Sequence, residues 1–484
     1  MALNLVRNSK VFFTTNVDAT TGKVNATGFT NANTYELQVL EGFSFSQNTN
    51  NETVTITEAG VAPVRGQRSF NTSLAPVDFS LSTYLRPKNV TTAISAEESV
   101  LWNAMFSTVS TDTSAVTIGG TISGVTYAFS NGVGTVTISG TSLTAAGVAV
   151  GDIVVIGGIT AATGAGTTAF NAAATVATIS GTSITLNLIN PTSTASTITT
   201  PASIKLYKSA WAPVNTGYSY ASSAASDKHQ LLKFGMLFIV DSVAYAVDNA
   251  AMAQVTIDFG LDAIATAAWT GQGTTLRQVS TNLTASNGSF SGSGATGNYL
   301  AKVTDAQYIA NKLSTVSMTL VNSLKDASGT TQGAAGDSYT IPITGGSITI
   351  NNNITYLTPA NLGVVNTPVA YYTGTRAITG TLNAYLRTGG TRDTGELLAD
   401  MLASASATIE PMAALAISIG GGANTVKIVV DMPATVLQVP SVDVQQVVST
   451  AINFTAEGYV PSSTADANVY DLTKTNDVAI RYYA

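Results

Sequence analysis

A hydrolase site in this chain would have to be built around one histidine. The chain contains a single histidine, His229 in the segment SDKHQ, and no cysteine. A Ser-His-Asp triad could therefore use only His229, and a Cys-His pair is impossible. The sequence also lacks a GxSxG elbow and a GxxxxGK[ST] phosphate loop. We expect His229 to be a polar surface residue near a domain junction, and we predict no catalytic residue and no enzyme activity.

Metal and cofactor sites find equally little support. Without cysteine no thiolate metal site can form, and no aspartate-rich loop has the ligand spacing that calcium requires. The adjacent Glu97 and Glu98 fit the start of a helix, where a carboxylate is favourable, better than a pair of acid and base catalysts. The glycines at 420–422 lack the strand-to-helix context of a dinucleotide loop. The sequence therefore predicts no cofactor and no metal.

Two arginines, Arg86 and Arg387, occupy the same position in two similar segments of the chain. Tyr84-Leu85-Arg86 closes the alternating segment VDFSLSTYLR, and Tyr385-Leu386-Arg387 closes RAITGTLNAYLR, at an offset of 301 (385 minus 84). Alternation of apolar and polar residues predicts a strand with one buried face in each segment. Arg86 and Arg387 are then candidate contacts between modules, each placed to pair with a carboxylate of a neighbour.

The strands that end in these arginines belong to a longer internal repeat. The segment GFSFSQNTN at 42–50 matches SITINNNIT at 347–355, with Phe43 and Phe45 aligned to Ile348 and Ile350. Both segments alternate and end in an asparagine-rich turn. The match indicates two copies of one module.

Two further matches extend the repeat toward the end of each copy. The segment LFIVDS matches IVVDM, which aligns Asp241 with Asp431, and VTIDFGLDA matches TAINFTAEG, which aligns Phe259 with Phe454. The offset is 190 at the aspartates (431 minus 241), so the first copy contains 111 additional residues (301 minus 190). We expect an insertion in copy one.

Each copy is also expected to contribute one amphipathic helix that covers its sheet. Ser95 and Glu98 have the spacing of a capping box, and Asp393 and Glu396 repeat it. The apolar residues expected on the inner helical face are Val100, Leu101, Ala104 and Met105 in copy one and Leu398, Met401 and Leu402 in copy two.

The insertion is predicted to be a small all-β domain over residues 112–227. This stretch is nearly free of charge and rich in Gly, Thr and Ser, with short alternating runs such as GTVTISGTSL. An immunoglobulin-like domain is the expected kind, and a low-complexity loop is the alternative.

The expected fold class is mainly β with minor α. Two tandem β-sandwich or barrel modules, each with one helix, are joined by a glycine- and serine-rich linker, and the first is interrupted by the inserted domain. The predicted boundaries are 1–111 and 228–279 for copy one, 112–227 for the insert, 280–299 for the linker and 300–484 for copy two.

Composition limits the classes of function. The 484 residues include 21 basic and 28 acidic ones, so only 10% are charged and the net charge is −7. A surface this poor in charge suggests coverage by other protein in an assembly, and a deficit of Lys and Arg argues against a nucleic-acid binder. The N-terminus does not resemble a signal peptide, and the apolar stretches are too short to span a bilayer. We expect a soluble protein without membrane contact.

Three segments resemble a known family. LVRNSKVFFTT near the start, TITEAGVAPVRGQRSFNTSLAPVDFSLSTYLRPK at 55–88 and YTIPITGGSITINNNITYLTP at 339–359 closely resemble the major tail tube protein of bacteriophages with long, non-contractile tails. Within this siphovirus-type family the chain is similar to the subgroup whose subunit contains two fused tube modules. The likeness is strongest over residues 1–110 and 300–400.

The resemblance implies a ring of three subunits with six modules in pseudo-sixfold symmetry, and rings that stack into a hollow tube. Double-stranded DNA would pass through the joined inner β-barrel without specific binding when the genome is ejected. Expected partners are further copies of the chain, a tape measure protein in the lumen, and tail tip and terminator proteins at the ends. The protein would be made in the host cytoplasm and located in the virion tail. Members of the subgroup can carry an extra C-terminal domain, whereas this chain has its addition inside copy one.

Reasoning from the residues agrees with a ring, because open sheet edges are satisfied when neighbouring modules pair. The insert should project outward, since 111 additional residues in the channel would block it. Two alternatives remain: a β-rich adhesin or glycan-binding surface protein, which predicts monomers that bind carbohydrate, and a hydrolase that depends on His229.

Overall fold

A computed structural model describes most of the two predicted copies and of the insert. The described residues are 9–25, 29, 33–54, 68–90, 93–96, 98–106, 115–130, 133–146, 148, 150, 153–163, 173–188, 197–201, 203–208, 231–240, 243–261, 263–279, 309–362, 364–408, 411–420, 427–444, 447–457 and 478–483. The predicted linker at 280–299 and His229 lie outside them. Strands dominate, and the described residues contain two α-helices, which confirms the prediction of a mainly β fold with minor α.

The first half of the main sheet comes from two separate parts of the chain. Its strands are β1 (Ser9–Thr14), β2 (Thr34–Leu37), β3 (Ser44–Val54), β4 (Arg68–Tyr84), β16 (Phe234–Val240), β17 (Val243–Gly260), β18 (Thr266–Gly273) and β19 (Thr275–Val279). A short hairpin of β5 (Pro87–Val90) and β6 (Ala93–Ala96) leads into helix α1 (Ser99–Phe106).

The second half is continuous in sequence. Its main strands are β20 (Thr315–Leu320), β23 (Ser338–Ile341), β24 (Ile343–Asn351), β27 (Ala377–Tyr385), β28 (Met412–Gly420), β29 (Lys427–Leu437), β30 (Ser441–Asp443), β31 (Ser449–Ala456) and β32 (Ala479–Tyr483). Smaller elements are the 3₁₀-helix η4 (Asn311–Leu313), β21 (Leu324–Lys325), β22 (Thr331–Gly333), β25 (Ile354–Leu357), β26 (Ala370–Thr373) and helix α2 (Thr394–Ser404).

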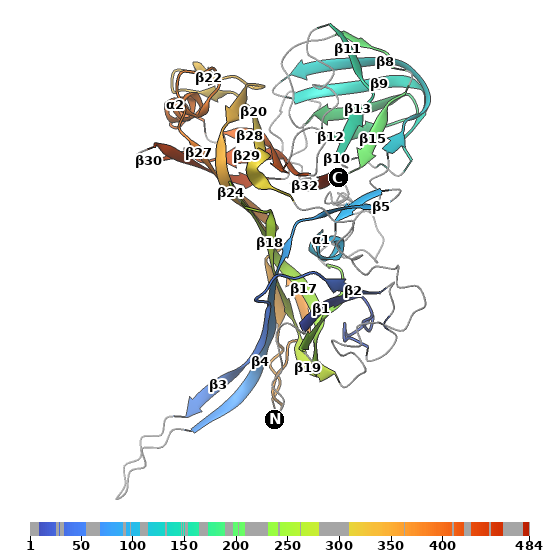
Figure 1. The fold of residues 1–484 in the computed structure, drawn as a ribbon, viewed down its shortest axis with the longest axis vertical. Coiled ribbons are helices and arrows are strands. Elements are labelled where there is room, and N and C mark those ends of the chain that lie inside the picture. Colours follow the sequence, from blue (N-terminus) through green and yellow to red (C-terminus); the bar gives the residue numbers. More distant parts are fainter. Residues whose placement is uncertain are drawn as a thin grey trace, which may run out of the picture.

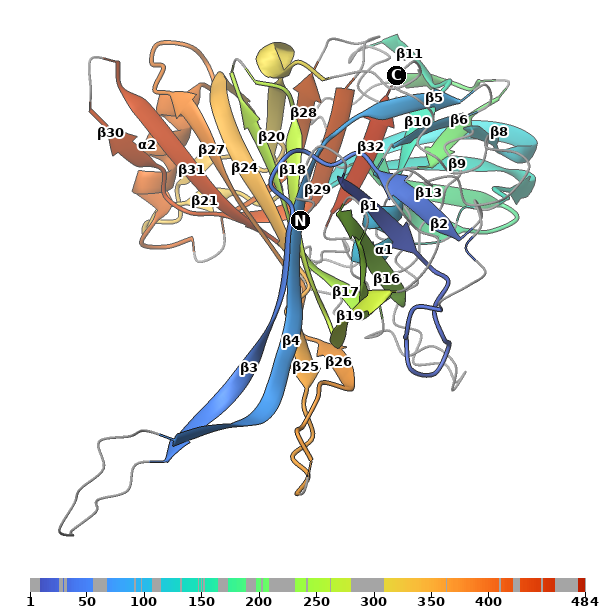
Figure 2. The ribbon, with the colours of Figure 1, turned by 60° about the horizontal axis from the view of Figure 1, so that its bottom comes forward.

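Strand pairing follows the same order in both halves. The first half runs β2-β1-β16-β17-β18-β4-β3, with β19 also on β17. The second runs β23-β20-β28-β29-β31-β27-β24, with β32 also on β29 and β30 on β31. Antiparallel pairing of β17 with β24 joins the halves into one sheet of 17 strands (Figures 1 and 2).

The registers fix which residues of the two halves correspond. Leu85 N donates to Ala265 O, and Leu386 N donates to Val448 O, both at 3.0 Å, so the two Tyr-Leu-Arg segments are equivalent. Phe45 lies opposite Phe79 in one half, and Ile348 lies opposite Gly380 in the other. Phe45 therefore corresponds to Ile348, and the predicted alignment of Phe43 with Ile348 was wrong by two residues.

The two later matches were also wrong, although both lie in related strands. Asp431 lies in β29, whose counterpart is β17, whereas Asp241 follows β16 and is outside the described residues. Phe454 lies in β31, whose counterpart is β18, whereas Phe259 belongs to β17. Period-2 strands of one sheet share the same alternation, so a short match cannot distinguish neighbouring strands.

Only the second predicted helix start has the expected cap. Ser95 pairs with Lys88 in the β5–β6 hairpin, so α1 begins at Ser99 and the proposed Ser95 cap was wrong. Asp393 caps α2 by accepting from Gly395 N at 3.1 Å and Glu396 N at 3.0 Å. Glu396 accepts from the backbone N–H of Arg392, one residue before the expected partner.

The inner faces of the helices agree with the prediction in α1 and only partly in α2. Val100, Leu101, Ala104 and Met105 are buried, as expected. In α2 the buried apolar residues are Leu397 and Met401, whereas the residue Leu402 is 58% exposed, in contrast to its predicted inward position.

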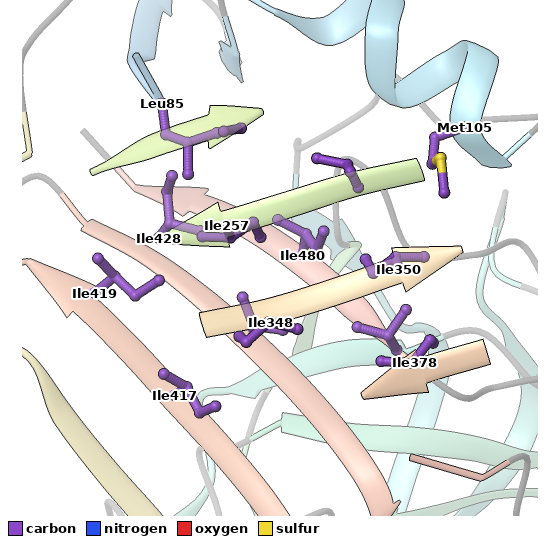
Figure 3. Packing of buried hydrophobic residues seen from close by; sticks show 14 of the residues in the cluster. Leu85, Met105, Ile257, Ile348, Ile350, Ile378, Ile417, Ile419, Ile428 and Ile480 are labelled. Carbon is purple, nitrogen blue, oxygen red and sulfur yellow. The ribbon is translucent and has the colours of Figure 1, made fainter. Parts of the chain in front are cut away.

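One hydrophobic core extends through both halves (Figure 3). It includes Ile257 and Ile348 of the central junction, both fully buried. Trp102 of α1 packs edge-on against Trp269 at 4.7 Å and donates from Nε1 to the hydroxyl of Tyr482 at 2.8 Å. The Tyr482 hydroxyl in turn donates to the buried carboxylate of Glu98. The last strand, β32, is thereby tied to the helix of the first half.

A separate sheet occupies the predicted insert. Its seven strands follow the order β7 (Ala115–Thr117), β15 (Lys205–Lys208), β10 (Ile153–Gly157), β12 (Ala173–Ile179), β13 (Ser183–Leu188), β9 (Val133–Thr144) and β8 (Gly119–Ser130). A two-stranded sheet of β11 (Thr160–Thr163) and β14 (Thr197–Thr199) accompanies it. These strands enclose their own hydrophobic cluster, which includes Val136, Ile138 and Leu186. The exact domain boundaries and the immunoglobulin-like description stay predictions.

Candidate assembly surfaces

One face of the joined sheet is apolar and the other is mostly polar. The apolar side chains of β4, β17, β18, β24, β27 and β31 point into the core, and the alternate residues point away from it. We call these alternate residues the polar face: Ser44, Ser46, Asp78, Ser80, Ser82, Tyr84, Gln254, Thr256, Asp258, Thr266, Ala268, Thr270, Gln272, Ser347, Thr349, Asn351, Thr379, Thr381, Asn383, Tyr385, Ser441, Asp443, Ser449, Ala451, Asn453 and Thr455.

Hydrogen bonds across strands connect neighbours on the polar face. The Oγ1 atoms of Thr256 and Thr349 are 3.1 Å apart across the junction of the two halves. Gln272 donates to Asp78 at 2.9 Å. Charged members of the polar face are limited to Asp78, Asp258 and Asp443, and none of its members is Lys or Arg. Such a face offers hydroxyl and amide groups but no cation that could hold a phosphate.

The row of strands that carries the polar face, β3-β4-β18-β17-β24-β27-β31-β30, has an open edge at each end. β3 pairs only with β4, and β30 pairs only with β31, among the strands that the structure describes. Every residue of β30 is exposed, and the residues Val442 and Val444 are 44% and 77% exposed. An uncovered edge with apolar side chains is a template for pairing with another chain.

Two hairpins project from the same end of the sheet (Figure 2). One is the long β3–β4 hairpin, and the other contains β25 and β26. The second carries exposed apolar side chains near its tip: Leu357, Leu362, Val364, Val365 and Val369, with exposures from 50% to 104%. Its backbone is fixed against β4, because Leu74 N donates to Asn366 O at 2.8 Å and Asn366 N donates to Thr72 O at 3.2 Å.

The two predicted contact arginines lie at equivalent positions in different surroundings. The Arg86 residue is only 4% exposed, whereas Arg387 is exposed at the end of β27. Hydrogen bonds from backbone N–H groups, first that of Glu396, lower the pKa of Asp393, and the charge of Arg387 lowers it further. Contact of either arginine with another module stays a prediction, and the exposure favours Arg387.

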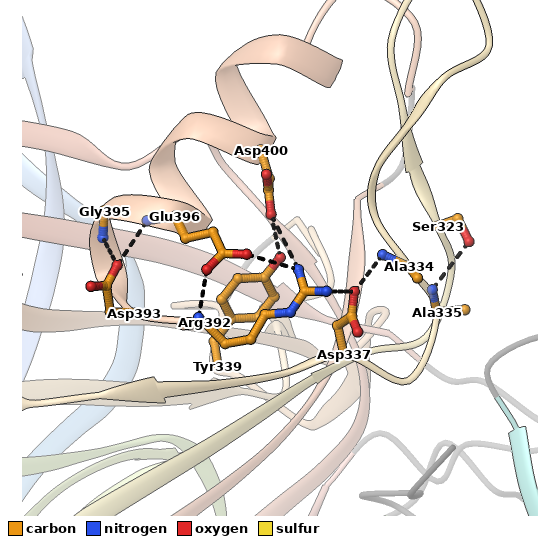
Figure 4. A network of polar contacts seen from close by, with 10 residues as sticks. All are labelled: Ser323, Ala334, Ala335, Asp337, Tyr339, Arg392, Asp393, Gly395, Glu396 and Asp400. Atoms are coloured by element: carbon orange, nitrogen blue, oxygen red, sulfur yellow. Dashed lines mark hydrogen bonds and ion pairs between the residues drawn. The ribbon is translucent and has the colours of Figure 1, made fainter. Parts of the chain in front are cut away.

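A charged network that the sequence did not predict surrounds Arg392 (Figure 4). The Arg392 guanidinium contacts Asp337 Oδ2 at 2.6 Å, Glu396 Oε1 at 3.1 Å and Asp400 Oδ2 at 3.7 Å. Tyr339 donates to Asp400 Oδ2 at 2.6 Å, and its pKa is raised, chiefly by burial. The network attaches α2 to the loop before β23, which is a structural role. Asp337 and Arg392 are 55 positions apart (392 minus 337), so no local pattern could have revealed the pair.

The described residues offer little material for a catalytic or metal site. No group of three His, Cys, Asp or Glu residues among them could hold a metal ion. Glu98, one of the two adjacent glutamates, is buried and accepts a hydrogen bond from Tyr482. None of the helices in this part of the chain is long and apolar enough to cross a membrane.

Comparison with known proteins shows that the chain is similar in sequence to a phage tail protein. No protein-family model matches the sequence. The chain is 24% identical over 466 residues to the tail tube protein pb6 of Escherichia phage T5, and the match covers 94% of this chain and 73% of the relative. This similarity along almost the whole chain confirms the predicted relationship to phage major tail tube proteins.

Proposed function

We propose that the protein is the structural subunit of a phage tail tube, in which three copies form a ring and rings stack into a hollow conduit. The observation that carries the proposal is the joined sheet: two halves with the same strand order pair through β17 and β24, and the row of strands that carries the polar face has an open edge at each end, β3 and β30. Head-to-tail pairing of such edges closes a ring when the rotation fits, and a ring of six modules leaves neither of these two edges exposed.

The polar face suits the lining of a DNA conduit. Its charges are three aspartates, and hydroxyl and amide groups provide most of the rest. DNA is held by Lys and Arg that neutralise phosphates, so a lining without them lets the duplex slide. We propose that this face lines the lumen, where a tape measure protein would lie before the genome is ejected.

The hairpins at one end of the sheet suit contact between stacked rings. A heterologous contact, in which the apolar tip at 357–369 meets a different surface of the next ring, produces an open filament. Tail tip and terminator proteins would cover the two ends of the tube. The relative pb6 is named a tail tube protein, and this favours a structural role in the virion tail without catalysis.

Negative-stain microscopy of the purified protein tests the proposal. We expect hollow tubes of uniform width, with threefold averages when isolated rings are viewed down the axis. Persistent monomers at high protein concentration would contradict it, and monomers that bind a carbohydrate array would favour the adhesin alternative.

A further inference from the structure

We infer that β30 of one subunit pairs antiparallel with β3 of the next, in the register that places Val442 opposite Phe45. The inference rests on the proposed function and specifies the contact between subunits. The partner is a second copy of this chain, because the chain already contains an equivalent junction between its own halves.

The internal junction provides the template. Residues 254–260 of β17 pair with residues 345–351 of β24, with Ile257 opposite Ile348 and Thr256 opposite Thr349. Both isoleucines are fully buried on the apolar face, and the two threonine hydroxyls meet at 3.1 Å on the polar face. The junction therefore contributes both to the core and to a continuous polar face.

Each strand of the junction has a counterpart at an open edge. Asp258 of β17 lies opposite Thr266 in β18, and Asp443 of β30 lies opposite Ser449 in β31, the counterpart of β18. Val442 therefore takes the place of Ile257. On the other strand Phe45 takes the place of Ile348, as the pairing with β4 and β27 requires. The template then gives four pairs between subunits: Ser441 with Ser46, Val442 with Phe45, Asp443 with Ser44, and Val444 with Phe43.

These pairs match in chemistry on both faces. Val442 and Val444 are exposed in the single chain, and Phe43 and Phe45 are half-buried with their rings stacked on Phe238 at 5.7 and 4.6 Å. Pairing would cover the valines with aromatic rings and place Ser441 beside Ser46, as Thr256 lies beside Thr349. Apolar neighbours across strands stabilise a sheet.

Two differences from the template change the fit without changing the register. In the internal junction the Phe259 ring lies over Gly346, where an added Cβ would be 2.9 Å from the ring. The corresponding pair between subunits is Val444 with Phe43, so the aromatic ring moves to the other strand. Pro440 takes the place of Val255 and has no N–H to donate, which removes one ladder bond at this position.

Disulfide cross-linking tests the register in a chain that has no cysteine of its own. Paired residues in an antiparallel sheet have Cα atoms about 4.5–5.5 Å apart, within the range that a disulfide spans. We expect the double variant Ser441→Cys with Ser46→Cys to form covalently closed trimers under mild oxidation. The matched control, Thr256→Cys with Thr349→Cys, should form its disulfide within one chain and remain a monomer on a non-reducing gel.

A shifted pair distinguishes this register from a slip of two residues. Ser441→Cys with Ser44→Cys should cross-link about tenfold more slowly, because diagonal neighbours are about 7–8 Å apart. Faster cross-linking of this shifted pair would overturn the register. Tubes that assemble while Ser441→Cys with Ser46→Cys gives no bond between chains would overturn the inference and leave the proposed function intact. Absence of rings and tubes from the cysteine-free protein would instead remove the proposed function and this contact with it.

Discussion

Asp400 is the residue whose protonation we expect to influence folding most directly. Burial raises its pKa, and Glu396 and Asp337 raise it further, while the hydrogen bond from Tyr339 and the charge of Arg392 lower it. A carboxyl with a raised pKa binds its proton more tightly in the folded state than in the unfolded state. Its contribution to the free energy of unfolding therefore falls as the pH rises from about 4, the ordinary value for Asp, through the folded pKa.

We predict that Asp400→Asn flattens this part of the stability curve. Urea unfolding of both proteins between pH 4 and pH 7, at roughly unit intervals, measures the difference. Asp393→Asn is the contrast: the lowered pKa of Asp393 makes its contribution fall only below about pH 4, so this variant should run parallel to the unchanged protein between pH 4 and pH 7. Parallel curves for Asp400→Asn and the unchanged protein would count against the assignment.

Glycine and phenylalanine face each other across neighbouring strands in both halves. A Cβ on Gly271 would lie 2.2 Å from the Phe79 ring, and one on Gly380 would lie 2.3 Å from the Phe454 ring. The positions correspond, but the aromatic residue is on β4 in the first half and on β31 in the second. Each half therefore has one glycine opposite one phenylalanine, so the total side-chain volume is the same although the two residues have exchanged strands. In both halves the aromatic ring covers the backbone of the glycine.

We predict that Gly380→Ala lowers the free energy of unfolding by about 1–3 kcal/mol, since the new methyl group meets the Phe454 ring and the carbonyl oxygen of Ser347 at 2.7 Å. Gly260→Ala is the matched control in another strand, where no atom lies within 4 Å of the new Cβ. It should change stability by less than about 0.5 kcal/mol. Denaturant unfolding measures both, and equal effects would contradict the packing explanation.

The apolar hairpin tip gives a prediction about assembly. Replacement of Leu362, Val364 and Val365 by Ser should leave folding intact, because these residues are 51% to 104% exposed. Tube length should shrink and single rings should accumulate, since the lost apolar area no longer holds one ring on the next. Size-exclusion chromatography and microscopy give the ratio of rings to tubes. Full-length tubes from the triple variant would exclude the tip from stacking.

The sequence revealed the repeat but not its exact alignment. The repeated Tyr-Leu-Arg identified equivalent strand ends correctly, because three identical consecutive residues fix the alignment of the two copies at that point. The alignment of Phe43 with Ile348 is two residues off because a two-residue slip keeps every side chain on the same face. Only the strand pairing, Phe45 with Phe79 and Ile348 with Gly380, resolves it. The sequence predicts a helix cap at Ser95 because hairpin ends use the same residue types as caps. The open edges depend on partners distant in sequence, so no local pattern could predict them.

At the scale of the whole molecule, the insert has its own core and sheet. None of its strands pairs with the 17-stranded sheet among the described residues. It contacts the second half where the Phe129 ring lies against Gly336, at a position where a Cβ would be 2.4 Å from the ring. Loss of this contact should lower the free energy of unfolding far less than loss of a core strand would.

We predict that replacement of residues 112–227 by a short Gly/Ser linker preserves tubes with the same lumen and a smaller outer diameter. Cryo-electron microscopy of both tubes measures the two diameters directly. A widened or emptied lumen in the shortened variant would show that the insert projects inward and would refute the outward placement.

The hydrogen bond between Trp102 and Tyr482 can form only when synthesis of the chain is almost complete. The two residues are 380 positions apart, so at about 5–20 residues per second the first helix waits roughly 20–75 s for its final partner. Strand β30 also emerges late, whereas β3 is made early. During most of its synthesis a nascent chain therefore contains β3 but not β30, so it cannot offer both ends of the row that carries the polar face until it is nearly finished.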